Sequence, residues 1–313
     1  MSAASRQTLV TGASGFIGRH LVAHLLAQGI DVVAVPGPFG RCDAARGMRV
    51  LPGRDLAADV DWRDALVDVD RVIHLAGLAH GRSGADEARM QRVNRDGSLT
   101  LARAAQQAGV ERFVFVSTVA VHGHRAERAI DESALCDGPG AYAQSKRDAE
   151  QALGALLEDR LCVLRPPLVH GPGAPGNPAR LLALVERGVP LPLASVTNRR
   201  SSIGVSNLSD ALLRCATHPD AGGERFLVAD DPPLSTAELV RQLARRLGRP
   251  DRLWRLPPTL LRVGATLLGR RALVERLLDD LEIDSGHIRH RLAWTPPRSQ
   301  DEGLDAWVAG RSR

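Results

Sequence analysis

Residues 8–18 read TLVTGASGFIG, a short apolar run followed by three glycines spaced three residues apart, Gly12, Gly15 and Gly18. Glycine is needed where the backbone turns sharply and where a Cβ would block a phosphate group. The next residues, 19–29, have the apolar spacing of an amphipathic helix that ends at a glycine. A strand, a glycine turn and a helix in this order predict the first βαβ unit of a dinucleotide-binding domain, although a tight turn can need glycine without any ligand.

Further apolar runs alternate with helical segments along the first half of the chain. Residues 30–35, 71–77 and 112–118 are predicted strands, and residues 100–110 are a predicted helix that ends near a glycine. Such alternation is typical of a doubly wound parallel sheet. We therefore expect an α/β fold with a Rossmann-type sheet.

The second half of the chain differs, because loops rich in proline and glycine separate its helical runs. Ser235 and Glu238 have the spacing of a capping box at the start of one of these helices. We expect a dinucleotide-binding domain at residues 1–165, with a returning segment near 200–218, and a smaller α/β substrate domain at residues 166–313.

Composition and charge narrow the functional class. The 313 residues are 44% apolar, which is enough for a full core, and the formal net charge is +5. Because the arginines are spread along the chain without interleaved aromatic residues, we expect no nucleic-acid partner, whereas small anionic ligands remain compatible. The absence of a leader pattern and of a long apolar run predicts a cytoplasmic protein without a stable membrane anchor. We expect no metal and no disulfide, since the cysteines lack the spacing for either: Cys42, Cys136, Cys162 and Cys215.

Residues 141–146 read AYAQSK and hold the only tyrosine and the only lysine of a chain that otherwise uses arginine for its cations. In a helix that starts after Gly140, Tyr142 and Lys146 lie one turn apart on the same face. A nearby ammonium favours the phenolate and should lower the tyrosine pKa toward neutral pH. A lysine ammonium can also bond two neighbouring hydroxyls, so we interpret the pair as an acid–base device. A non-catalytic dinucleotide-binding protein, the alternative of another class, would have no reason to keep it.

The second predicted strand lacks the acidic residue that would bind the adenosine ribose about 20 residues after the glycine turn. The chain reads AVPGPFGRCD there, and Asp31 begins the strand instead of ending it. Arg41 and Arg46 follow and could accept a 2′-phosphate, so NADP is favoured over NAD. Either arginine could instead be a solvated surface charge.

Several motifs together resemble the extended short-chain dehydrogenase/reductases, in particular the NAD-dependent epimerase/dehydratase group that acts on nucleotide sugars. The motifs are TGASGFIG at 11–18, DL at 55–56, HLAG at 74–77, Asn94 in VNRDGS, FVFVST at 113–118, Y-x-x-x-K at 142–146, LRPPLVHGPG, NRRSSIGVSNLSDA and IDSGHIRHRLAW. The resemblance covers nearly the whole chain.

The resemblance implies that Tyr142 is the general acid–base residue, that Lys146 is its partner and binds the nicotinamide ribose, and that Thr118 bonds the reacting sugar oxygen. It also implies that Asn177 and Arg200 hold the nucleotide and its diphosphate. Each role has a structural alternative: Asn177 could only form a turn, and Arg200 could be a solvated charge. The hydroxyls of Ser117 and Thr118 could only cap the end of the strand. The expected cofactor-binding residues are Gly12, Ser14, Gly15, Phe16, Ile17, Arg41, Asp55, Leu56, Leu75, Ala76, Gly77, Asn94, Ser117, Tyr142 and Lys146.

Departures from the family pattern narrow the expected reaction. Val119 and Ala120 follow Thr118 where dehydratases of the family have an acidic pair, which argues against a 4,6-dehydratase. His122 and His170 replace tyrosines that usually precede glycine, and PPLVHG stands where many epimerases have an asparagine. The stretch after residue 165 most resembles enzymes that reduce the 4-keto group of UDP-linked 6-deoxy-N-acetylhexosamines for bacterial surface polysaccharide. We therefore favour a 4-ketoreductase, with a UDP-hexose 4-epimerase that holds NAD tightly as the alternative.

Residues 260–281 read LLRVGATLLGRRALVERLLDDL, an apolar stretch flanked by arginines. It could pack in the core or lie on a membrane surface, and core packing is favoured because acidic residues share its polar face. A homodimer through helices that flank the sheet is expected from the family resemblance alone.

Overall fold

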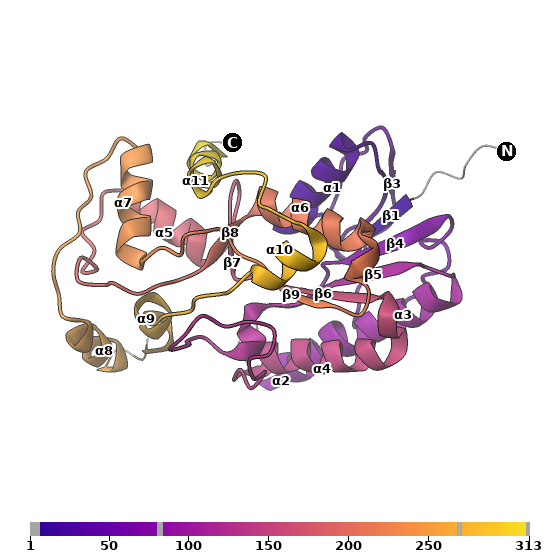
Figure 1. Ribbon diagram of the computed structural model, residues 1–313, viewed down its shortest axis with the longest axis horizontal. Helices are drawn as coiled ribbons and strands as arrows, with labels where there is room; N and C mark the ends of the chain where they lie inside the picture. The colour runs from indigo at the N-terminus through magenta and orange to yellow at the C-terminus, as the bar shows by residue number, and fades with distance from the viewer. Residues whose placement is uncertain (1–6, 80–83, 268, 270, 311–313) are drawn as a thin grey trace.

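The computed structural model describes residues 7–79, 84–267, 269 and 271–310. In this part of the chain, seven parallel strands form a central sheet between layers of helices (Figure 1). The predicted doubly wound parallel sheet is confirmed. Its strands are β1 (Gln7–Thr11), β2 (Asp31–Val35), β3 (Met48–Val50), β4 (Val69–His74), β5 (Arg112–Val116), β6 (Leu161–Arg165) and β9 (Arg225–Leu227).

The order across the sheet is β3-β2-β1-β4-β5-β6-β9, and every neighbouring pair is parallel. The chain moves outward from β1 to β3 and then crosses back to β4 on the other side of β1. Such a reversal opens a crevice beyond the carboxyl ends of the strands. The segments that follow β1, β4 and β5 therefore meet at one edge of the sheet.

Two apolar clusters hold the helices against the sheet. The first joins one face of the sheet to α1 (Phe16–Ala27), α6 (Val205–Thr217) and α10 (Gly286–Leu292). The second joins the other face to α3 (Ser98–Gln107) and α4 (Ala141–Leu157). Figure 1 shows α1 and α6 on one side of the sheet and α3 and α4, with α2 (Gly84–Gln91), on the other. A short π-helix at Arg92–Gly97 leads from α2 into α3.

The chain leaves the sheet after β6 and later returns to it. Outside the sheet, β7 (Leu168–His170) and β8 (Ser202–Gly204) pair in parallel with each other. The chain then re-enters through α6, which packs against α1, and through β9, which pairs with β6. The return therefore extends to Leu227.

A second group of helices lies beyond the carboxyl edge of the sheet, at the left of Figure 1. There α5 (Asn177–Glu186), α7 (Thr236–Arg246) and α11 (Gln300–Ala309) share an apolar cluster. The predicted capping box of Ser235 and Glu238 begins α7 and is confirmed.

The arginine-flanked stretch at residues 260–281 folds as parts of two helices, α8 (Pro258–Leu267) and α9 (Arg271–Leu278). Leu261 of α8 packs with Val274 and Leu278 of α9 in a small apolar cluster, but Leu260 faces solvent. The expected core packing is therefore correct for one side of α8 and wrong for the other. None of the described helices has both the length and the apolarity that a membrane crossing requires.

Candidate active site

The glycine turn after β1 brings three segments close together. Gly12 has φ +67°, and a Cβ on it would lie 2.9 Å from the backbone nitrogen of Ala76. A Cβ on Gly18 would lie 2.1 Å from the carbonyl oxygen of Gly12, so only glycine lets α1 pack this closely on the turn. Gly15 is the N-cap of α1 and offers no side-chain cap, which leaves the first amides of the helix at Phe16 and Ile17 for an anionic ligand. The turn thus fits the pyrophosphate of a dinucleotide.

The segment after β2 folds back over this turn. A Cβ on Gly40 would lie 2.0 Å from the Ser14 hydroxyl oxygen, so the chain passes directly over Ser14 just before the exposed Arg41. Asp31 lies at the opposite end of β2, as the sequence predicts. Nearby, Leu56 is buried, and Asp55 accepts a hydrogen bond from the Ala57 amide at 3.0 Å.

The segment after β4 is held by a buried asparagine. The Asn94 side chain accepts from the Leu78 amide at 2.7 Å and donates both to the Leu78 carbonyl and to the Ser145 hydroxyl, each at 2.9 Å. Because these bonds occupy its amide group, Asn94 fixes the segment from Leu75 through Ala76 and Gly77 onto α4. A Cβ on Gly77 would lie 3.4 Å from Nζ of Lys146, so this segment runs directly beside the ammonium.

Tyr142 meets Thr118 where β5 ends. The Thr118 side chain caps a short 3₁₀ helix by accepting from the Ala120 amide at 3.2 Å, and it lies close enough to the Tyr142 hydroxyl to lower the pKa of that phenol. Tyr142 keeps some exposed surface, yet its hydroxyl lies deep enough that burial raises its pKa, and the effect of Thr118 only partly opposes this rise. The expectation that Lys146 lowers this pKa is therefore wrong for the protein alone. The phenol keeps its proton at neutral pH.

The reason lies in the direction of the lysine side chain. Lys146 is buried, and its Nζ donates to the carbonyl oxygen of Val116 at 2.8 Å and lies 4.5 Å from the centre of the Phe115 ring. The ammonium therefore faces the end of β5 and Gly77. Burial lowers the pKa of Lys146 to about 8, and the charge of Glu150 partly opposes this shift.

Glu150 belongs to a buried network that we did not predict from the sequence. It accepts a short hydrogen bond from Ser117, and it pairs with Arg165 at the end of β6, with 2.5 Å between its Oε2 and the guanidinium Nη2. Glu150 lies four residues after Lys146, so Tyr142, Lys146 and Glu150 follow one face of α4. The spacing of four residues, from Tyr142 to Lys146 and again from Lys146 to Glu150, was the feature of the sequence that could have revealed the role of Glu150.

The network continues to His122. Arg165 Nη1 donates to His122 Nε2 at 3.0 Å, so the proton of the neutral ring is on Nδ1, which donates to the Leu135 carbonyl at 3.1 Å. Burial and the charge of Arg165 lower the pKa of His122, in agreement with this neutral form. His122 therefore ties the segment before α4 to β6, which is a structural role.

Of the two residues expected to bind the nucleotide, Asn177 lies in α5 and Arg200 lies just before β8. Asn177 is exposed in the first turn of α5, after Gly176 with φ +73°. Arg200 forms a backbone bridge with Leu234, and its Nη1 donates to the Asp279 carbonyl at 2.8 Å. Arg200 thus joins three chain segments and is no freely solvated charge.

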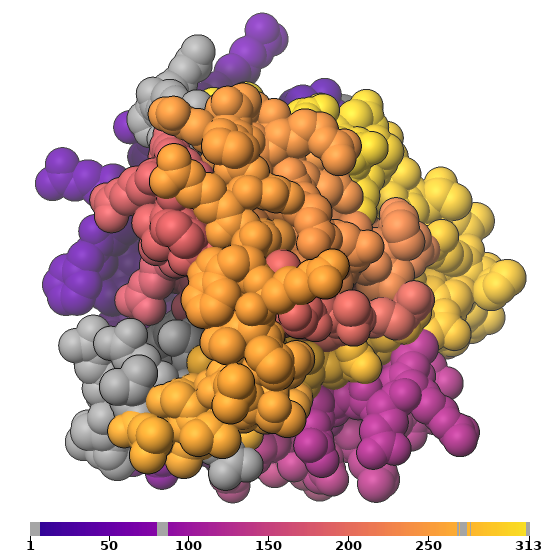
Figure 2. All heavy atoms as spheres, turned by 90° about the vertical axis from the view of Figure 1, so that its left-hand side faces the viewer, coloured from indigo at the N-terminus to yellow at the C-terminus, as the bar shows by residue number. Residues whose placement is uncertain are grey.

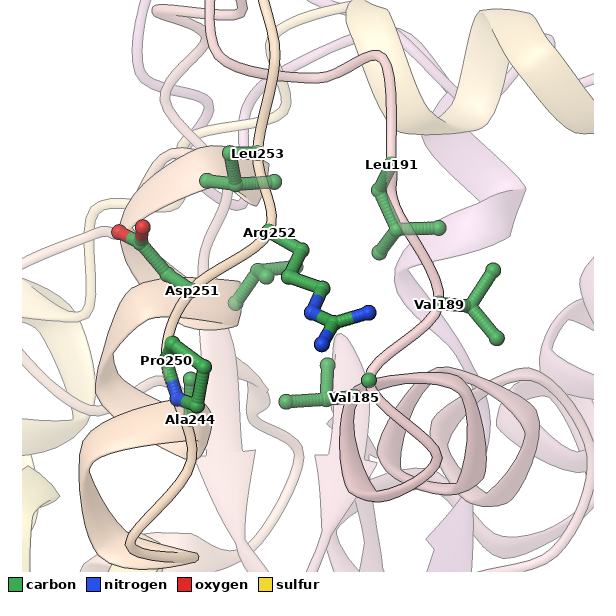
Figure 3. Close-up of a pocket in the computed structure, with 10 residues that line it drawn as sticks. Val185, Val189, Leu191, Ala244, Pro250, Asp251, Arg252 and Leu253 are labelled. Atoms are coloured by element: carbon green, nitrogen blue, oxygen red, sulfur yellow. The ribbon is translucent and has the colours of Figure 1, made fainter.

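The hollow drawn in Figure 3 is separate from this site. It lies between α5 and α7 with mainly apolar walls that include Val185 and Leu253, and the Arg252 side chain reaches across it. Its room of about 10 Å³ suits a single water molecule and is too small for a sugar or a nucleotide. This hollow is therefore no substrate site.

Comparison with known proteins identifies the family of this chain. The model of the NAD dependent epimerase/dehydratase family matches residues 8–229. The chain belongs to this family. The resemblance drawn from the sequence motifs is confirmed, and so is a nicotinamide adenine dinucleotide as the cofactor.

Individual relatives extend the match over almost the entire chain. UDP-glucose 4-epimerase of Vibrio cholerae is 34% identical and aligns with 96% of this chain and 93% of its own. Ceramide reductase of Caulobacter vibrioides is 32% identical and aligns with 82% of this chain and 75% of its own. The solved structure of MoeE5 in complex with UDP-glucose and NAD is 29% identical, with a TM-score of 0.77 and coverage of 97% of this chain and 98% of that one.

Proposed function

We propose that this chain oxidises and reduces C4 of a UDP-linked hexose and works as a 4-epimerase. The observation that carries the proposal is the contact between Tyr142 and Thr118 at the end of β5, with Lys146 one helical turn away. This arrangement occurs in a chain 34% identical, over nearly its full length, to a UDP-glucose 4-epimerase.

In the proposed reaction the Tyr142 hydroxyl moves a proton to and from O4 of the sugar. Thr118 lies beside the phenol, so it can share the same sugar oxygen and fix its position. The dinucleotide, when bound, supplies the two-electron acceptor and donor for C4. Proton transfer from O4 also requires the phenolate form of Tyr142, whose charge the Lys146 ammonium stabilises if its side chain turns from Val116 toward the phenol.

The remaining residues hold the reactants. The glycine turn and the N-terminus of α1 bind the pyrophosphate, and Arg41 and Ser14 lie where the adenosine end passes. Asn94 acts by holding the segment that contains Ala76 and Gly77, since its own amide is already bonded. We assign Asn177 and Arg200 to the nucleotide and its diphosphate, within a substrate region drawn mainly from residues 166–313, apart from the segments that return to the sheet.

A 4-ketoreductase is the second candidate, and two observations favour it. Burial keeps the proton on Tyr142, which is the form that donates to a carbonyl oxygen. A reductase is also the activity named for the Caulobacter relative. In this version the substrate is a UDP-4-keto-6-deoxy-N-acetylhexosamine for surface polysaccharide, and Arg41 favours NADPH. For either reaction we propose a cytoplasmic homodimer.

The first experiment is to heat-denature freshly purified protein and identify any nicotinamide nucleotide that it releases. Near-stoichiometric NAD, together with conversion of UDP-glucose to UDP-galactose without added cofactor, is the result expected for an epimerase. Protein free of nucleotide that consumes NADPH or NADH only with a 4-keto sugar supports the reductase. A protein that does neither with any UDP-sugar tested contradicts the proposal.

Tyr142→Phe tests the site itself. Removal of a general acid–base group should lower turnover by about 100- to 10,000-fold while the affinity for the dinucleotide changes little. Thr118→Val should also lower turnover, and Thr100→Val is its matched control, because Thr100 bonds only the Asp96 carbonyl of the π-helix that leads into α3. Full activity of Tyr142→Phe would refute our assignment.

A further inference from the structure

An apolar stripe faces solvent on α8. Leu260, Val263 and Leu267 follow one another at intervals of three and four residues, so they lie on one face of the helix. Their exposed fractions are 56%, 58% and 83%. On the other side of the helix, Leu261 packs into an apolar cluster and Ala265 is buried, so α8 is apolar toward both the protein and the solvent.

Trp254 is a further exposed apolar side chain near α8, since its neighbour Leu253 packs in the same small apolar cluster as Leu261. It lies in the segment between α7 and α8 and is 47% exposed, whereas Trp62, Trp294 and Trp307 are almost completely buried. The segment and α8 lie together at the end of the molecule farthest from β1 in Figure 1, and Figure 2 shows this end from outside, with the orange chain across its surface. An exposed tryptophan near exposed aliphatic side chains is typical of surfaces that contact the boundary between lipid and water.

The charge of the same segment is positive. Residues 249–267 contain four arginines and one carboxylate, Asp251, which pairs with Arg241 of α7. Arg249 and Arg255 are exposed, and the structure records no ion pair for either among the described residues, while Arg262 pairs with Asp279 at 2.7 Å. Arginines beside an apolar stripe complement an anionic lipid surface, because the apolar side chains enter the interface while the guanidinium groups meet the headgroups.

We propose that α8, together with Trp254, Arg249 and Arg255, is a contact surface for an anionic lipid bilayer. The helix lies in the plane of the interface and does not cross it, so binding is reversible and falls with ionic strength. This surface lies on the second group of helices, away from the sheet, and the proposal does not depend on the identity of the sugar or of the reaction.

The test is co-sedimentation of the full chain with vesicles of phosphatidylcholine alone or mixed with phosphatidylglycerol. We expect binding only to the mixed vesicles, and a reduction of at least tenfold for a variant with Leu260→Ser, Val263→Ser and Leu267→Ser. The matched control carries Val67→Ser and Leu184→Ser, which remove exposed apolar side chains elsewhere, and it should bind like the unchanged chain. Arg249→Gln with Arg255→Gln should also weaken binding to the mixed vesicles.

Tryptophan fluorescence gives a second readout. Since three of the four tryptophans are buried, a blue shift on addition of mixed vesicles should come from Trp254 and should disappear in Trp254→Phe. Absence of sedimentation with the mixed vesicles, or equal binding by the triple variant, overturns the proposal. Self-association that the triple variant abolishes, without vesicle binding, would identify the stripe as a contact between two copies of the chain and would likewise overturn it.

Discussion

Among substitutions that keep the shape of the side chain, Glu150→Gln should be one of the most destabilising in this chain. The substitution keeps the volume but leaves the buried Arg165 without its carboxylate, and it removes the charged acceptor of Ser117. Removal of one partner from a buried ion pair costs about 3–5 kcal/mol, out of a typical free energy of unfolding of about 5–15 kcal/mol.

Urea unfolding of the purified variant measures this loss. The matched control is Glu282→Gln, because Glu282 pairs with Arg199 through two hydrogen bonds at 2.6 and 2.8 Å at a much more exposed position. That change should cost less than about 1 kcal/mol. Glu150→Gln combined with Arg165→Met should cost less than the sum of the two single changes, because no unpaired charge remains buried. A loss below about 1 kcal/mol for Glu150→Gln would refute the argument.

The same variant has a second readout in the pH profile. The charge of Glu150 raises the pKa of Lys146 against the effect of burial, so its removal should lower that pKa below the present value of about 8. The titratable groups that interact with this ammonium are His74 from β4 and Glu150 from α4, with Arg165 behind Glu150. If activity needs the ammonium, its alkaline decrease should move to lower pH in Glu150→Gln, and an unchanged profile would show that Glu150 acts only on stability.

Three further outcomes are expected. Gly18→Ala should abolish dinucleotide binding or folding, since its Cβ would lie 2.1 Å from the Gly12 carbonyl oxygen; normal binding measured by cofactor fluorescence would contradict the close packing. Burial lowers the pKa of Lys146 from 10.5 to about 8, so between these values the unfolded chain binds more protons than the folded one; stability in urea should rise with pH over this window, and Lys146→Met should abolish the rise. Ser235→Ala should cost about 1 kcal/mol by removing the capping box of α7, and a thermal melt unchanged from that of the parent chain would disprove this.

The sheet could be predicted from the sequence because its strands are nearly continuous apolar runs separated by amphipathic helices. The glycine turn and the pair of Tyr142 and Lys146 could likewise be identified from the sequence as candidates. Their chemistry depends on spacings of three and four residues along a short stretch of chain. β3, β6 and β9 were not predicted. β3 and β9 have only three residues each, and β9 is stabilised by pairing with β6, which is distant in the chain.

The pKa of Tyr142 could not be predicted from the spacing of residues along the chain. Residues four apart share a helix face, but the direction of a long side chain depends on partners from other elements, here the carbonyl of Val116 and the ring of Phe115. The link from Glu150 to Arg165 and His122 was inaccessible for the same reason, because it joins β6 and α4 to a short helix after β5. The exposed side of α8 was missed because an apolar pattern does not reveal which side of a helix is covered.

The late return of the chain to the sheet has a consequence for synthesis on the ribosome. When the residues up to β6 have emerged, one face of the nascent sheet still lacks α6 and α10, and its edge still lacks β9. Buried side chains such as Val10, Ile73 and Leu164 then face water, and the open edge of β6 can pair with another chain. The growing polypeptide therefore has its greatest need for a chaperone between the synthesis of β6 and that of α10, and a messenger truncated in this interval should yield an aggregating product, not a small stable domain.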